Sequence, residues 1–262
     1  MSICSICCGL WENRWKLFIE GLKKIKYTLL SVIVLEEFVS KGKLFISVVT
    51  KFLIGLVFVG LLLFLPARTF SYKNGWLFIG LLFIPMFILG IVLFVKFPEL
   101  LEKRLSFKEK EGTQKGVVAF SALIFLGGFI IAGLDFRFYW SYVPLWVEIV
   151  ACVILLVSYG LYGEVMRENS YLSRTVEVQK NQKVIDTGLY GIIRHPMYVA
   201  TIFLFLSIPL VLGSWWSFVL FLFYPVVIVV RIKNEEKVLS LGLAGYSEYM
   251  KKVPWRLIPF VW

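Results

Sequence analysis

Long apolar runs separated by short polar stretches dominate the chain. Four of these runs occupy residues 44–65, 76–97, 116–134 and 143–163, and each contains at most one charged residue. At a rise of about 1.5 Å per residue, a helix of this length crosses the roughly 30 Å hydrocarbon core of a bilayer. Because backbone groups in lipid must find hydrogen-bond partners within their own segment, the four runs predict four transmembrane helices.

A fifth apolar stretch, residues 197–230, is too long for one crossing and is interrupted at Gly213-Ser214. Glycine favours a tight turn, so we expect two short helices that form a hairpin within the membrane. The chain is therefore predicted to be an all-α polytopic integral membrane helix bundle. It should have about six transmembrane helices, a C-terminal helical hairpin and interfacial helices.

Both ends of the chain carry amphipathic segments. Residues 1–43 mix lysines with apolar and aromatic residues and predict a helix at the membrane surface, with a short additional span as the alternative. Residues 237–253 predict a second amphipathic helix after the hairpin. We accordingly divide the chain into an N-terminal interfacial segment (1–43), a four-helix transmembrane region (44–163) and a C-terminal region (164–262) that holds the chemistry.

Composition supports the membrane class and narrows the partners. Hydrophobic residues make up 59% of the chain and charged residues 17%, whereas soluble domains carry about 25% charged residues. The net charge of +11 comes from Lys and Arg placed between the apolar runs. We therefore expect contact with membrane lipid headgroups and no nucleic acid. Cys4, Cys7 and Cys8 form the one cysteine cluster, and with a single histidine in the chain they predict no metal site.

The basic residues alternate from one side of the predicted membrane to the other. The N-terminal segment, the loops 98–115 and 164–196 and the C-terminal tail are rich in Lys and Arg, whereas the loops 66–75 and 135–142 hold few. Basic loops face the cytoplasm in most membrane proteins. We expect an integral protein of the cell (inner) membrane with both termini and the loop 164–196 in the cytoplasm.

The polar loop before the hairpin has the residue types of a binding site. Gly188 and Gly191 permit tight turns. Pro196 is favoured in the first turn of a helix and keeps His195 out of helical geometry. Arg194 and His195 should then lie beside a helix N-terminus, where free N–H groups and a guanidinium suit an anion.

The far end of the hairpin returns to the same side of the membrane. Arg231 and Glu235 are four residues apart and share a helix face, while Glu236 is rotated away by about 100°. We expect these groups to meet Arg194 and His195 in one charged pocket. The alternative is that the two acids only begin a solvated helix, where the helix dipole favours them.

Four short motifs surround the hairpin in a fixed order: Gly188-Leu189-Tyr190, Arg194-His195-Pro196-Met197-Tyr198, Arg231 with Glu235-Glu236, and Tyr246-x-x-Tyr249 before Pro254. Their order and spacing resemble the isoprenylcysteine carboxyl methyltransferase family and its phospholipid-methyltransferase relatives. The resemblance covers roughly residues 164–259. It implies a membrane enzyme that transfers a methyl group from S-adenosylmethionine.

The resemblance also implies roles by position. Arg231 matches an arginine that engages the substrate carboxylate, and Arg194 and Glu235 are the other predicted catalytic residues. The chain departs from the common pattern at Leu189 and Ala200, where members often have Pro and Gly. The predicted cofactor-binding residues are Gln182, Lys183, Val184, Ile185, Tyr190, His195, Pro196, Met197, Tyr198, Glu235 and Glu236.

Methyl transfer suits these residue types. The reaction needs a nucleophile held close to the methyl carbon, and orientation alone can supply about 7–11 kcal/mol. A carboxylate acceptor, with a pKa near 3.5, is already ionised at neutral pH. An amine acceptor would instead need Glu235, Glu236 or His195 to accept a proton. The expected substrate is a lipophilic small molecule or lipid-modified compound that carries a carboxylate.

Other functions stay open from the sequence alone. A phospholipid amine N-methyltransferase uses the same donor, and an NADPH-dependent enzyme like the sterol reductases shares a similar motif set. A transporter or scaffold would need polar residues within the membrane, and Lys51 and Glu148 are poor candidates. Tyr246 and Tyr249 are assigned to an aromatic belt at the membrane surface. The oligomeric state is not predicted.

Overall fold

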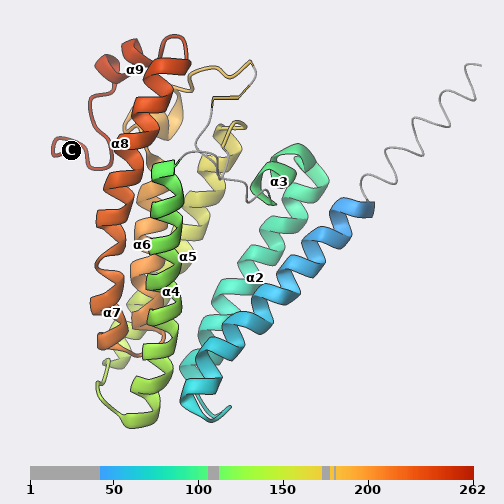
Figure 1. Ribbon diagram of the computed structural model, residues 1–262, viewed down its shortest axis with the longest axis vertical. Helices are drawn as coiled ribbons and strands as arrows, with labels where there is room; N and C mark the ends of the chain where they lie inside the picture. Colours follow the sequence, from blue (N-terminus) through green and yellow to red (C-terminus); the bar gives the residue numbers. More distant parts are fainter. Residues whose placement is uncertain (1–41, 106–111, 173–177, 180) are drawn as a thin grey trace, which may run out of the picture. The chain divides into compact units, whose positions relative to one another are not determined.

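The computed structural model describes residues 42–105, 112–172, 178–179 and 181–262, and every regular element in these ranges is helical (Figure 1). Contacts divide the chain into two compact units, Met1–Thr50 and Lys51–Trp262. The predicted surface helix and the cluster of Cys4, Cys7 and Cys8 lie outside the described residues. The description below concerns the second unit. The helix Gly42–Ala67 begins in the first unit, which ends at Thr50, and continues into the second.

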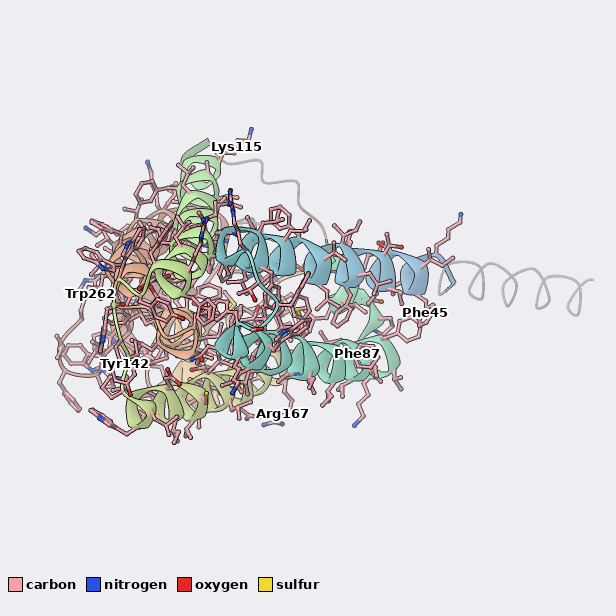
Figure 2. All side chains as sticks on the ribbon, turned by 90° about the horizontal axis from the view of Figure 1, so that it is seen from below. Phe45, Phe87, Lys115, Tyr142, Arg167 and Trp262 are labelled. Atoms are coloured by element: carbon pink, nitrogen blue, oxygen red, sulfur yellow. The ribbon has the colours of Figure 1, made fainter. Side chains whose placement is uncertain are left out.

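Among the described residues, five helices are long and apolar enough to cross a membrane, and the shorter apolar helix Pro196–Val211 is a sixth apolar helix, beside the prediction of about six transmembrane helices. Many of their apolar side chains are exposed, such as Val95 at 71%, and Phe87 projects outward from α2 (Figure 2). Such exposure in a bundle of apolar helices is typical of surfaces that face lipid. The chain is therefore an integral membrane protein. The five helices are Gly42–Ala67, α2 (Lys73–Lys96), α4 (Gly112–Phe138, apolar from Lys115), α5 (Leu145–Glu168) and Trp215–Gly242.

The predicted hairpin is present, and its turn lies where the sequence placed it. Helix α6 (Pro196–Val211) ends just before Gly213, whose φ of 76° is the left-handed geometry that favours glycine. Ser214 then caps α7 (Trp215–Phe221) by accepting a hydrogen bond from the Ser217 amide at 3.1 Å. The two arms differ more than predicted, because α6 has 16 residues whereas the returning arm continues to Gly242.

The returning arm has a small break that the hydrophobic pattern did not show. Helix α8 (Tyr224–Gly242) follows α7 after only Leu222 and Phe223. Pro225 lies in the first turn of α8, and a proline cannot donate the amide hydrogen bond that would continue the preceding helix. Leu222 and Phe223 both keep right-handed helical dihedral angles, so the arm runs on almost without a bend.

A buried carboxylate fastens the hairpin turn to the end of α4. Asp135 is 1% exposed and accepts hydrogen bonds from the Ser141 amide at 2.7 Å and the Ser141 hydroxyl at 2.6 Å. The Ser214 hydroxyl also donates to Asp135. Tyr72 donates from its hydroxyl to the Leu212 carbonyl. These bonds compensate the cost of burying polar groups, and they fix the hairpin turn against two neighbouring loops.

Close helix contacts hold the hairpin arms against α4. Helices α4, α6 and α8 run side by side (Figure 1). A Cβ atom at Gly128 would lie 2.2 Å from the Phe221 ring, so only glycine allows α7 to approach α4 this closely. Phe125 meets the rings of Phe205 and Tyr224 at centroid distances of 4.6 and 5.9 Å. These contacts set the spacing of the two arms whose other ends form the site.

The prediction of one amphipathic helix over residues 237–253 is wrong. Helix α8 ends at Gly242, and a separate helix α9 (Tyr246–Lys252) follows. Gly245 adopts a left-handed φ of 82°, which a continuous helix does not allow. The turn buries Tyr246 and Tyr249 against Leu243. Two further short elements are α3 (Pro98–Leu105) and the 3₁₀ helix η1 (Gly188–Gly191).

Candidate active site

The start of α6 and the second half of α8, which are the two ends of the hairpin away from its turn, lie together as predicted. Glu236, on α8, is 6% exposed, and one of its oxygens accepts from Arg194 Nε at 2.7 Å and lies 3.2 Å from His195 Nε2. Its other oxygen accepts from Arg256 Nε at 2.8 Å. We call Glu236 with Arg194, His195 and Arg256 the Glu236 ion cluster. The cluster joins the loop before α6, the middle of α8 and the C-terminal tail.

A second set of polar contacts lies one residue away on α8. Tyr198 donates its hydroxyl hydrogen to Glu235 and accepts a hydrogen bond from Arg231 Nε at 2.8 Å. The Arg231 guanidinium carbon also lies 5.9 Å from the centre of the Tyr198 ring, within the range of cation–π attraction. Successive residues on a helix point about 100° apart, which is why Glu235 and Glu236 serve different partners.

These groups border a cavity of about 780 Å³, counted with its open mouth. The walls come from the loop before the hairpin, the start of α6, the second half of α8 and α9. Ten of the predicted residues line it: Gln182, Lys183, Val184, Ile185, Tyr190, Arg194, His195, Met197, Tyr198 and Glu235.

Three predicted residues lie beside the cavity and do not line it. Pro196 is the first residue of α6 and gives that helix its start. Glu236 lies in the ion cluster beneath the Arg194-His195 wall. Arg231 is not part of the lining, and its hydrogen bond to the Tyr198 hydroxyl links it to a residue that is. The structure thus brings all the predicted residues into one region but gives them different positions in it.

Seven residues that line the cavity were not among the predicted site residues. Tyr246 and Tyr249 were assigned to an aromatic belt, and this is wrong, because both are 5% exposed and face the cavity. Their spacing of three residues on one helix face was the signal in the sequence. For the other five residues, their place in the lining depends on how distant segments of the chain pack together, which the sequence does not show. The others are Asn169, Tyr171, Leu172, Leu239 and Leu243.

The end of α5 holds the cavity loop in place. The Glu168 carboxylate accepts from the Thr187 hydroxyl at 3.0 Å and from the Leu189 amide at 3.2 Å. Gly188, between them, has a φ of 49°, and a Cβ atom there would lie 2.1 Å from a Glu168 oxygen. The expected tight turn at Gly188 is confirmed, and its reason is the close approach of this carboxylate.

Helix α9 closes the cavity from the other side. The Tyr249 hydroxyl donates to the Tyr190 carbonyl at 2.7 Å, and Lys252 pairs with Asp186 at 2.6 Å on the surface. Burial raises the pKa of Tyr246 and of Tyr249 above its usual value, so both phenols stay neutral. The hydrogen bond from Lys252 lowers the pKa of Asp186. The closed wall is therefore neutral inside and charged only at its rim.

The cavity has the character of a site for an amphipathic ligand. Val184, Leu239 and Leu243 supply apolar surface, and Glu235 supplies a carboxylate at one edge. A pocket with apolar walls and a few fixed polar groups is the usual form of a cofactor site. The bonded Tyr198 hydroxyl adds a polar link from this edge toward Arg231.

Comparisons with known proteins agree with this location. Residues 146–242 match the family model described as phospholipid methyltransferase. The chain is also similar to the Delta(14)-sterol reductases of Mus musculus (23% identical over 125 residues) and Arabidopsis thaliana (24% over 127). These matches cover 42% and 44% of this chain but only 30% and 34% of the reductases. The Delta(14)-sterol reductase of Methylotuvimicrobium alcaliphilum is 23% identical over 45% of this chain and 31% of its own length.

The chain thus spans about a third of the length of the curated relatives it matches. The family model, in contrast, matches from the start of α5 to the end of α8, which carry most of the cavity lining and, except for Arg256, the residues of both sets of polar contacts. The resemblance drawn from the motifs is confirmed over this range. Residues 146–242 form a domain of the phospholipid methyltransferase family.

Proposed function

We propose that this protein transfers a methyl group from S-adenosylmethionine to a lipophilic acceptor that reaches the site from the membrane. The observation that carries the proposal is the position of the cavity. It lies where both ends of the intramembrane hairpin meet, next to Arg231, Tyr198 and Glu235. The phospholipid methyltransferase domain supports the reaction class.

The residues of the cavity fit the methyl donor. Its apolar side chains suit an adenosine group, and the Glu235 carboxylate suits a ligand with cationic or hydroxyl groups. We assign the loop Gln182 to Ile185 and the residues around Tyr190 and His195 to this ligand. When bound, S-adenosylmethionine supplies an electrophilic methyl carbon. The task of the protein is then to hold that carbon and the acceptor in line.

Arg231 is the residue best placed to orient an acceptor. It donates to the hydroxyl of Tyr198, which lines the cavity, and its neighbours along α8, Val227, Ile228 and Ile232, are buried. A guanidinium binds a carboxylate through a planar pair of hydrogen bonds. A carboxylate brought there is already ionised and needs no base. We therefore favour a carboxylate acceptor, as in isoprenylcysteine carboxyl methylation, and place Arg194 as a support that fixes Glu236.

Two alternatives rest on specific observations. Glu235 accepts a hydrogen bond from Tyr198, and this pair could accept a proton from a phospholipid amine. The similarity to three Delta(14)-sterol reductases favours a reduced nicotinamide as the ligand of the same cavity. We further propose that the cavity opens to the cytoplasm, where either cofactor is available.

A pair of calorimetric titrations tests the proposal. Purified protein in lipid nanodiscs is titrated with S-adenosylmethionine and, in parallel, with NADPH. We expect heat of binding with the first ligand only. Absence of a signal with millimolar S-adenosylmethionine would overturn the proposal, and a signal with NADPH alone would support the reductase alternative.

Substitution of Arg231 separates the acceptor from the cofactor. We expect Arg231→Ala to abolish methyl transfer to lipophilic carboxylates while the Kd for S-adenosylmethionine changes by less than about threefold, because Arg231 does not line the cavity. Lys233→Ala, which removes an exposed cation from the same helix, serves as the control. Loss of cofactor binding in Arg231→Ala alone would contradict this division of roles.

A further inference from the structure

The C-terminal tail, residues 253–262, is bonded to the segment that lines the cavity, although it lies beyond the residues that match the family model. The Arg194 amide donates to the Trp255 carbonyl at 2.9 Å, and the His195 amide donates to the Arg256 carbonyl at 3.0 Å. Arg194 also donates from its guanidinium to the Val253 carbonyl at 2.7 Å. The tail therefore pairs, residue by residue, with the corner that leads into α6.

Arg256 adds a side-chain contact to this pairing. Its Nε donates to one oxygen of Glu236, while the other oxygen is used by Arg194 and His195. The two oxygens of one carboxylate are thus divided between the tail and the cavity wall. Arg194, His195 and Glu236 are nearly fully buried, whereas the Arg256 side chain is 32% exposed.

The guanidinium of Arg256 is itself held in place. Its central carbon lies 5.1 Å from the centre of the Trp262 ring, within cation–π range. Leu257, the next residue, is 8% exposed and packs with Ile228 and Ile232 of α8. Arg256 is consequently fixed by an aromatic ring on one side and by the packing of its neighbour on α8.

The geometry shows what Arg256 does for Glu236. A carboxylate with one bonded oxygen can rotate about its last torsion and offer either oxygen to the groups nearby. With both oxygens bonded, its plane is set, and so are the positions of Arg194 Nε and His195 Nε2. Charge-assisted hydrogen bonds of this kind are strong and directional. Both of the residues so positioned line the cavity.

We infer that Arg256 is a positioning residue of the cofactor site, which acts through Glu236 on Arg194 and His195, and that the functional unit extends past residue 242 into the tail. The inference rests on the proposed function only for the identity of the ligand. The same cavity wall would be positioned for a nicotinamide cofactor.

The experiment is a double-mutant cycle on cofactor affinity. Full-length protein in nanodiscs is prepared as wild type, Arg256→Gln, Arg256→Lys, Glu236→Gln and the double variant of Arg256→Gln with Glu236→Gln. Lys251→Ala, which removes an exposed cation from the end of α9, is the matched control. The Kd for S-adenosylhomocysteine and the melting temperature are measured for each. NADPH replaces S-adenosylhomocysteine if the wild type binds only NADPH.

We expect Arg256→Gln to raise the Kd by about tenfold, the size of one lost charged hydrogen bond, and Lys251→Ala to leave it unchanged. Arg256→Lys should lie between, because lysine keeps the charge but lacks the fork and the flat stacking surface. If Arg256 acts through Glu236, the double variant should bind no more weakly than Glu236→Gln alone.

Two results would overturn the inference. One is a Kd effect of Arg256→Gln that multiplies with that of Glu236→Gln, because independent action would give additive free energies. The other is a lowered melting temperature with an unchanged Kd, which would make Arg256 a purely structural residue. A wild type that binds neither ligand would instead overturn the proposed function, since the cycle compares variants against wild-type binding.

Discussion

The replacement of Glu236 by glutamine tests the Glu236 ion cluster most directly. The amide keeps the size of the side chain and one acceptor oxygen but removes the negative charge. Arg194 is then left as a buried cation without a charged partner at position 236, with its side chain 5% exposed and only neutral acceptors in the Val253 carbonyl and the new amide. Breaking a buried ion pair by removing one partner costs about 3–5 kcal/mol.

That cost should be visible as a large loss of thermal stability. In a chain of this size, about 1 kcal/mol shifts the melting temperature by roughly 2–4 °C, so Glu236→Gln should lower it by roughly 6–20 °C. The assay is thermal unfolding in one detergent with a thiol-independent dye or with intrinsic tryptophan fluorescence. Glu235→Gln is the matched control, because it makes the same chemical change one residue away and leaves Arg194 paired.

A second variant checks the physical reason. Adding Arg194→Met to Glu236→Gln removes the buried charge that the first substitution left unpaired, so part of the lost stability should return. The reasoning would be refuted if Glu236→Gln melted at the same temperature as Glu235→Gln. It would also be refuted if the second substitution only lowered the melting temperature further.

Three further predictions concern other parts of the molecule. Asp135→Ala leaves the donors at the hairpin turn without their acceptor, and should lower the free energy of unfolding by about 3 kcal/mol in chemical unfolding, with no change in cofactor Kd. Gly188→Ala costs about 1–2 kcal/mol at a left-handed φ and displaces the Glu168 carboxylate, so calorimetry should show a raised cofactor Kd. Tyr198→Phe removes the hydroxyl between Glu235 and Arg231, and should lower kcat by about tenfold or more with a nearly unchanged cofactor Kd; a purely structural Tyr198 would change neither parameter.

The position of the cavity agrees with the proposal of a soluble cofactor and a membrane acceptor. The hairpin arms lie among apolar helices, while the loop before α6 and helix α9 close the cavity at one end of them. Tyr198 lines the cavity and bonds both to Glu235, which also lines it, and to Arg231, which does not. In the proposed methyl transfer, the position of Tyr198 would therefore matter to both alternatives for the acceptor.

The sequence determined the membrane class, the apolar helices and the turn at Gly213. Each follows from local physics: a bilayer demands about twenty apolar residues per crossing, and a left-handed turn favours glycine. The motif residues of the site were also readable, because proline, histidine and paired acids occur at fixed short spacings. The same reasoning was wrong about residues 237–253, where the helix ends at Gly242 and Gly245, with a positive φ, precedes a separate helix.

Only the tertiary structure decided which charges pair. Three arginines and two acids lie near the ends of the hairpin, and nothing in their spacing assigns Glu236 to Arg194 and Arg256 or Glu235 to Tyr198. Pairings between residues 20 to 42 positions apart depend on how helices pack and how the tail folds back. The same holds for Asp135, whose partners come from a loop and from the hairpin turn. The hydrophobic periodicity of a segment depends only on residues that are close in sequence. These hydrogen bonds and ion pairs form only when the packing of the bundle brings distant segments together.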